Sequence, residues 1–156
     1  MLIYRIENVN GKGVYAMEEK VYHFTKAGLE NRSDTYCHPT PDNDPLISKW
    51  WIETRDKNKS QHYVFGFKDE EQLLDWFPVD GLRILHNYQN IMNREGNTLY
   101  GPDFYTFRVV VYNADDEFVK QGEKQCVFKK RFSSVVRKYS LKEFIEYVSE
   151  RVNLNC

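Results

Sequence analysis

The chain has 156 residues, of which 41% are hydrophobic and 29% are charged. This size and composition indicate one globular domain and exclude an intrinsically disordered or collagen-like protein. The 22 basic and 23 acidic side chains leave a formal net charge of −1, so no overall positive field draws the chain to nucleic acid or to a membrane. We expect a single domain over residues 1–156 whose contacts with partners are local.

The cysteines and the hydropathy pattern favour an intracellular protein. Cys37, Cys126 and Cys156 form no CxxC pair, and three cysteines cannot all pair within one molecule, which is typical of a reducing compartment. The N-terminus lacks the apolar segment of a signal peptide, and no apolar run approaches the ~20 residues that cross a bilayer. Secretion and membrane insertion are therefore not expected.

The first third of the chain predicts a strand, a long loop and a helix. Residues 2–7 are rich in β-forming side chains, and the turn residues 8–13 that follow indicate a hairpin-like start. Residues 31–44 are polar, and three prolines fall within residues 39–45, which predicts an ordered surface loop, here called the proline loop.

The segment DPLISKWWIET predicts a helix that begins near Pro45. Asp44 can cap such a helix, and proline is favoured at the first helical position. Helical spacing then places four apolar side chains on one face: Leu46, Ile47, Trp50 and Trp51.

The middle of the chain alternates between strand and helix signals. Residues 63–67 (YVFGF) read as a buried strand, in which Gly66 indicates a bulge or the close approach of another backbone or a ligand. Asp69 and Gln72 have the spacing of a capping box for a helix that ends at Pro78. A second helix is expected over residues 82–92.

The last third contains the strongest strand and helix signals. Residues 104–112 are dense in β-branched and aromatic side chains, and residues 124–132 are the expected partner strand. Ser140 and Glu143 form a capping box before the helical repeat of the tail. Because strands and helices do not alternate regularly, we predict an α+β fold with a mixed or antiparallel sheet and three to four helices packed mainly on one side.

Sequence motifs for metal, nucleotide or nucleophilic chemistry are absent. The four histidines show no HxH, HxxxH or HExxH spacing, so we expect no metal site. The chain has no GxSxG elbow and no phosphate-binding glycine loop. We expect no cofactor.

Two sequence features are candidates for partner binding. Aromatic residues make up 15% of the chain, which favours either a binding surface or aromatic-rich packing of a sheet, and Trp50 and Trp51 can be exposed anchors or core residues. The run from Lys129, Lys130 and Arg131 to Lys138 carries five positive charges and no acid. It can bind nucleic acid or cover a solvated strand end.

A third group consists of polar side chains on apolar strands or in the proline loop. Arg5 either points to solvent beside Glu7 or enters a cleft where it binds an anion. Gln125 poses the same question on a later strand. The group is completed by His38 with Asp42 and Asp44, and by Phe65 and Phe67 around Gly66.

The segments YRIE, GKGVY, HPTPDND, FGFKDEEQLLDWF and GEKQCVF, taken in this order, resemble small accessory proteins encoded by bacteriophages and prophages. These segments run from Tyr4 to Phe128 and leave the helical tail outside. The resemblance implies a phage accessory gene product of the host cytoplasm and implies no particular reaction.

The order of the polar residues is also similar to the three-point layout of ADP-ribosyltransferases. That resemblance implies that Arg5 holds NAD, that Phe65 or Phe67 frames the nicotinamide, and that Gln125 takes the place of the catalytic acid. A glutamine cannot supply negative charge, and only Glu123 could do so, since strand alternation puts residues 123 and 125 on one face.

Three functional hypotheses follow. The first is a non-catalytic phage protein that binds a host or anti-phage defence macromolecule through Trp50 and Trp51. The second is an intact or degraded ADP-ribosyltransferase-like enzyme that uses Arg5, His38, Glu123 and Gln125 around NAD. The third is nucleic-acid binding through residues 129–138.

Overall fold

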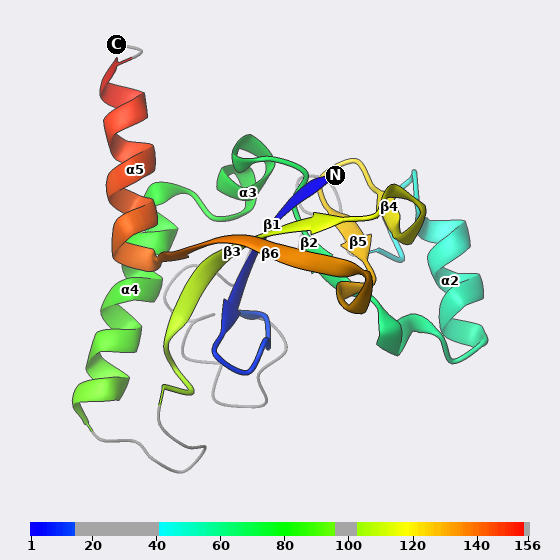
Figure 1. The fold of residues 1–156 in the computed structure, drawn as a ribbon, viewed down its shortest axis with the longest axis horizontal. Coiled ribbons are helices and arrows are strands. Elements are labelled where there is room, and N and C mark those ends of the chain that lie inside the picture. Colours follow the sequence, from blue (N-terminus) through cyan, green and yellow to red (C-terminus); the bar gives the residue numbers. More distant parts are fainter. Residues whose placement is uncertain (15–40, 96–102, 155–156) are drawn as a thin grey trace. The chain divides into compact units, whose positions relative to one another are not determined.

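The computed structural model describes residues 1–14, 41–95 and 103–154 (Figure 1). The strands in these ranges are β1 (Leu2–Asn8), β2 (Val64–Gly66), β3 (Phe107–Ala114), β4 (Val119–Gln121), β5 (Cys126–Phe128) and β6 (Ser133–Ser140). The helices are α2 (Ser48–Asp56), α3 (Glu70–Trp76), α4 (Val79–Arg94) and α5 (Leu141–Leu154). Three single turns of 3₁₀-helix are η5 (Ser60–His62), η6 (Asp116–Phe118) and η7 (Lys130–Phe132).

The strands of the described ranges form two antiparallel three-stranded sheets, in the orders β1-β3-β6 and β2-β5-β4. The predicted α+β class and number of helices are confirmed. The strands are divided between two small sheets, however, in place of one.

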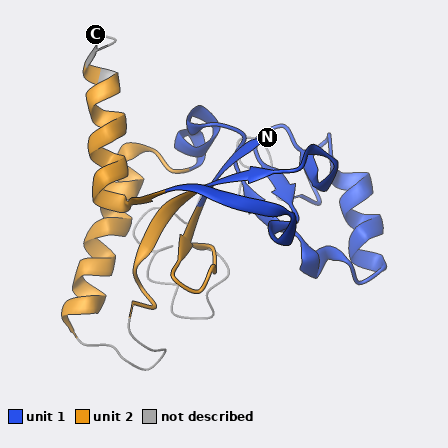
Figure 2. Cartoon of the chain, in the orientation of Figure 1, with its two compact units in different colours: residues 1–5, 31–76, 111–137 blue, residues 6–30, 77–110, 138–156 orange. Residues whose placement is uncertain are grey.

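The chain divides into two compact units, and both are discontinuous in sequence (Figure 2). The first unit contains residues 1–5, 31–76 and 111–137, and the second contains residues 6–30, 77–110 and 138–156. Strands β1, β3 and β6 each contribute residues to both units. The single domain expected from the sequence stays a prediction.

In the first unit, the β2-β5-β4 sheet is packed on both faces. Ile47, the residue before α2, and Trp51 of α2 form a buried cluster with Val127 of β5. On the other face, a Cβ built on Gly66 would lie 2.5 Å from Ile3 Cγ2 and 3.1 Å from the carbonyl oxygen of Tyr4. This close approach of the β1 backbone is what the glycine in YVFGF predicted, and it explains why a side chain is excluded at that position.

In the second unit, α4 and α5 pack against each other. Their buried side chains include Leu82 and Leu85 of α4 and Phe144 and Val148 of α5. Gln89 fixes α4 to β3, because its Oε1 accepts a hydrogen bond from the Phe107 backbone N–H at 3.0 Å.

Both predicted capping boxes are present. The Asp69 carboxylate accepts the Gln72 N–H at 2.8 Å, and Gln72 Oε1 in turn accepts the Lys68 N–H at 3.0 Å. At the start of α5, Ser140 Oγ accepts the Glu143 N–H at 3.1 Å and the Glu143 carboxylate accepts the Ser140 N–H at 2.8 Å. The bonds at α5 are reciprocal, whereas at α3 Gln72 accepts from Lys68, the residue before Asp69. At each helix, the side chain of Asp69 or Ser140 satisfies a backbone donor that a helix start leaves open.

The predicted start of α2 is wrong by three residues, since α2 begins at Ser48. The Asp44 carboxylate accepts the Leu46 N–H, and the Asp44 carbonyl accepts the N–H groups of Ile47 and Ser48, which closes a tight turn before the helix. Leu46 is therefore 68% exposed and does not share the buried face of Ile47 and Trp51.

The predicted strand over residues 124–132 is also too long. It ends at Phe128, and residues 130–132 form η7 before β6 begins. Residues 31–40 of the proline loop lie outside the described residues. No helix in the described part of the chain is long and apolar enough to cross a membrane.

Candidate functional site

The first unit carries a group of aromatic rings and lysines along one face of the β2-β5-β4 sheet. Phe65, Val127 and Lys120 are directly paired across the three strands, so their side chains point to the same face. This face also receives α2, since Trp51 lies beside Val127 and its ring centroid is 5.7 Å from that of Phe65. We call the following residues the aromatic–lysine surface: Trp50, Tyr63, Phe65, Phe118, Lys120, Lys129 and Phe132.

The rings of this surface are linked by edge and stacking contacts. Trp50 meets Tyr63 edge-on at 5.0 Å between centroids, and Phe118 stacks on Phe132 at 4.0 Å. Such pairs are stabilising beyond the area that they bury and hold the rings in fixed orientations. Phe65 is 40% exposed, and the other four rings are half-buried.

Two ammonium groups lie over these rings. Lys129 Nζ is 5.3 Å from the ring centroid of Tyr63, 5.5 Å from that of Phe118 and 6.0 Å from that of Phe132. Lys120 Nζ is 5.7 Å from the centroid of Trp50. These distances are within the range of cation–π attraction.

Neither lysine has an acidic partner among the residues that the structure describes. Burial raises the pKa of the Tyr63 phenol, so this ring is neutral beside the Lys129 ammonium at physiological pH. The surface therefore combines apolar rings with positive charge that no carboxylate of the described ranges neutralises, in a chain whose net charge is −1.

The structure separates the two tryptophans that were expected to act as exposed anchors. Trp51 is a core residue, 9% exposed, whereas Trp50 is half-buried at the edge of the surface. The expectation of exposure is wrong for Trp51 because residue 51 of α2 faces Val127 of the sheet.

The basic run is joined to Trp50 through Tyr63, which contacts both Trp50 and Lys129. Lys130 lies over the Tyr112 ring at 5.3 Å, and the exposed Arg131 stacks on Phe132 at 4.8 Å. From the sequence, the tryptophans and the basic run were expected to be separate binding sites for different ligands. The fold places Trp50 and Lys129 on one surface. Tyr63, Phe118 and Lys120 were missed, because the register that brings Lys120 to the face of Phe65 is set by pairing between distant strands.

The residues of the ADP-ribosyltransferase-like layout differ in their burial and in the elements that carry them. Arg5 is buried and its Nη1 donates a 2.5 Å hydrogen bond to the carbonyl oxygen of Phe65, so the expectation that it points to solvent is wrong. Phe67 is buried beside Trp76, with 6.0 Å between ring centroids, and its backbone pairs with Tyr4.

Glu123 and Gln125 lie in the turn between β4 and β5 and not on a strand. The expectation that strand alternation puts their side chains on one face is therefore wrong. Glu123 is exposed, whereas Gln125 is buried. His38 lies outside the described residues, and Asp42 forms an ion pair with Arg55.

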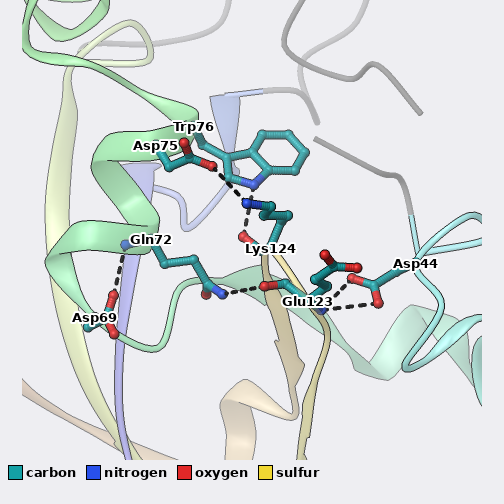
Figure 3. Close-up of polar contacts among 7 residues, drawn as sticks. All are labelled: Asp44, Asp69, Gln72, Asp75, Trp76, Glu123 and Lys124. Carbon is teal, nitrogen blue, oxygen red and sulfur yellow. Dashed lines mark hydrogen bonds and ion pairs between the residues drawn. The ribbon is translucent and has the colours of Figure 1, made fainter. Parts of the chain in front are cut away.

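The β4–β5 turn is held from two sides (Figure 3). The buried Asp44 carboxylate accepts the Glu123 N–H at 2.8 and 3.1 Å. From α3, Gln72 Nε2 donates to the Glu123 carbonyl at 3.4 Å and Trp76 Nε1 donates to the Lys124 carbonyl at 2.9 Å. These hydrogen bonds are made by the backbone of the turn, and the Glu123 side chain stays exposed. The network therefore fixes the position of the turn beside the sheet.

Two observations concern metal binding and the one described cysteine. No three His, Cys, Asp or Glu side chains within them gather as ligands for a metal ion. Burial, with a smaller contribution from the charge of Asp69, raises the pKa of the Cys126 thiol to about 12. Cys126 is therefore protonated at neutral pH and is a poor nucleophile.

A family model described as the bacteriophage T4 Y00F protein matches residues 1–142. The chain belongs to this family. The match spans β1 to β6 and ends two residues into α5, so it covers both sheets and the whole aromatic–lysine surface of this Y00F-family chain. It confirms the resemblance to phage-encoded proteins. No curated protein and no solved structure matches the chain.

Proposed function

We propose that this Y00F-family chain is a phage accessory protein that binds a host or defence-system protein through the aromatic–lysine surface, without catalysing a reaction, in the host cytoplasm. The observation that carries the proposal is the presence, on one sheet face, of half-exposed rings and of two lysines that have no acidic partner in the part of the chain that the structure describes. Binding energy in protein interfaces is concentrated in such rigid aromatic and cationic anchors.

The chemistry of the surface indicates the chemistry of its partner. Unpaired ammonium groups attract carboxylates, and a carboxylate that reaches Lys129 is also brought against the rings that surround it. The complementary element is therefore an acidic protein segment with apolar side chains next to its acids.

Nucleic acid is the alternative ligand, because bases stack on aromatic rings and phosphates bind lysines. The two ligand classes differ in their response to salt. Binding that depends on phosphate contacts weakens steeply and linearly with the logarithm of salt concentration, whereas an interface with buried rings at its centre is less sensitive.

The proposal is tested by quantitative affinity capture from extracts of infected and uninfected host cells, each with and without nuclease treatment. Wild-type protein is compared with Phe65→Ser and with the double variant Lys120→Glu, Lys129→Glu. Both changes alter exposed or half-buried groups, and circular dichroism verifies that each variant is folded. We expect one or a few host proteins to be enriched by wild type and lost at least tenfold with both variants.

The matched controls are Leu46→Ser and Lys142→Glu, which change an exposed apolar side chain and an exposed lysine outside the surface. They should retain the captured protein. Equal capture by all variants contradicts the proposal. Capture that disappears with nuclease treatment, combined with steep salt dependence of binding to single-stranded DNA or RNA, would assign the surface to nucleic acid instead.

A further inference from the structure

Lys120 and Lys129 occupy opposite corners of a four-residue unit on the aromatic–lysine surface. Lys120 of β4 is paired with Val127 of β5, and the Lys129 backbone N–H donates to the carbonyl oxygen of Phe118 at 3.1 Å. The pairing of the two strands thus continues by one residue, and the two lysines are diagonal neighbours. Such neighbours are about 7–8 Å apart in an antiparallel pair.

The two ammonium groups lie over different rings. Lys129 Nζ is within 6.0 Å of three ring centroids of the surface, whereas Lys120 Nζ lies 5.7 Å from the centroid of a fourth ring, that of Trp50. Lys129 is half-buried and Lys120 is exposed. Because each ammonium group is attracted to its own ring or rings, the surface presents two separate positive charges, which suit two anionic groups better than one.

The other two corners of the unit differ in burial. Val127 is fully buried in its cluster with Ile47 and Trp51. Phe118 is half-buried, so its ring is partly open to solvent. A ligand that contacts both lysines therefore also contacts the ring of Phe118, and apolar groups near its charges are favoured there.

An extended peptide segment has a matching separation of side chains. Its residues rise by about 3.3 Å each, and side chains two positions apart point to the same side, so they are about 6.6 Å apart. Neighbouring side chains on one face of a helix are closer, at about 5–6 Å. Two carboxylates on an extended segment can therefore reach one lysine each.

We propose that the partner segment binds in extended form and carries two acidic residues two positions apart, one for Lys120 and one for Lys129. The inference rests on the proposed function, since it specifies what the aromatic–lysine surface binds. Each carboxylate pairs with an ammonium group that has no acidic partner within residues 1–14, 41–95 and 103–154. The residue between the two acids points away from the surface, so its identity is not restricted.

The pattern is tested by selecting a library of random peptides on the immobilised full chain and sequencing the peptides that are enriched. Wild type is compared with Lys120→Gln and Lys129→Gln, each of which removes one charge. Lys142→Gln is the matched control, because Lys142 is an exposed lysine outside the surface. We expect acidic pairs two positions apart to be enriched over pairs at other spacings on wild type and on the control, and this enrichment to be lost on either surface variant.

A synthetic peptide of the most enriched sequence then assigns each acid to a lysine. Each acid is changed to its amide, alone and combined with Lys120→Gln or Lys129→Gln, and binding is measured by fluorescence anisotropy. Each single change should weaken binding about tenfold or more, because a hydrogen bond to a charged group is lost. When both members of a contacting pair are changed, the loss should be smaller than the sum of the single losses.

The outcomes separate this inference from the proposed function. Peptides that depend on the surface but carry a single acid, or acids three or four positions apart, overturn the inference and leave the proposed function standing. An absence of enriched peptides, or equal binding to wild type and to the Lys120→Glu, Lys129→Glu double variant, contradicts both. A thymidine oligonucleotide that binds wild type more tightly than the best peptide, and is lost with either lysine variant, assigns the two lysines to phosphates and overturns the inference.

Discussion

Asp44 is the residue that most clearly changes its role between sequence and structure. The sequence pattern makes it a helix cap, whereas its buried carboxylate accepts N–H groups of Leu46 and Glu123. It thereby ties the start of α2 to the β4–β5 turn. Gly122 is required beside it, since a Cβ at that position would lie 2.2 Å from Asp44 Oδ2.

Two substitutions test this role of Asp44. Asp44→Asn keeps the shape but removes the charge and one acceptor oxygen, and we expect the free energy of unfolding to fall by about 1–3 kcal/mol. Gly122→Ala places a methyl group against the same carboxylate, with an expected loss of about 1–3 kcal/mol. Urea denaturation followed by circular dichroism measures both values.

The control for these substitutions is Ser134→Ala, an exposed serine outside the turn, which should change stability by less than about 0.5 kcal/mol. If Asp44→Asn and Gly122→Ala behave like this control, the Asp44 carboxylate does not hold the turn.

At the level of elements, α5 depends on its capping box. Ser140→Ala removes the acceptor of the Glu143 N–H, and we expect it to lower the free energy of unfolding by about 1 kcal/mol. Glu143→Ala removes the reciprocal bond to the Ser140 N–H. Because each side chain bonds the other residue's backbone, the double variant should lose less than the sum of the two single losses.

Chemical denaturation of the four proteins in this cycle provides the measurement. Lys142→Ala is the internal control, because Lys142 lies between the two residues, is exposed and pairs only with Glu146 in the next turn. Strict additivity of the Ser140 and Glu143 effects would show that the two bonds form independently.

Elements defined by local signals were predictable from the sequence. Both capping boxes, the helix after Pro78 and the glycine contact in β2 involve residues close together in sequence or a backbone constraint. The region from β4 to β6 was not, because β4, β5 and η7 have only three residues each. In addition, β5 is fixed by pairing with β2 and β4, and the turn between β4 and β5 is held by Asp44. The aromatic–lysine surface depends on the same long-range register, so the sequence identified Trp50 and Lys129 without linking them.

For the molecule as a whole, the competing hypothesis is binding of NAD. We expect NAD at millimolar concentration to leave the melting temperature unchanged, because Arg5 is buried against the Phe65 carbonyl and the Glu123 side chain stands at an exposed turn. A ligand present at 100 times its Kd stabilises a protein by about 2.7 kcal/mol. In a protein of this size that would raise the Tm by about 5–10 °C.

Differential scanning fluorimetry with a titration of NAD provides the measurement, with AMP as the control for nonspecific nucleotide effects. A saturable rise in Tm that Arg5→Lys abolishes would support the ADP-ribosyltransferase-like hypothesis and contradict a function limited to protein binding.

The division of β1, β3 and β6 between the two units determines when, during synthesis of the chain, each unit has all its parts. The final segments of the two units are residues 111–137 and 138–156, so neither unit has all its parts until residue 137 has been synthesised. At about 5–20 residues per second, synthesis of the chain lasts about 8–30 s. During this time the apolar residues of β3 are synthesised before those of β6 that pair with them. A premature stop codon before residue 133 would therefore yield a product without β6, the strand that pairs with β3.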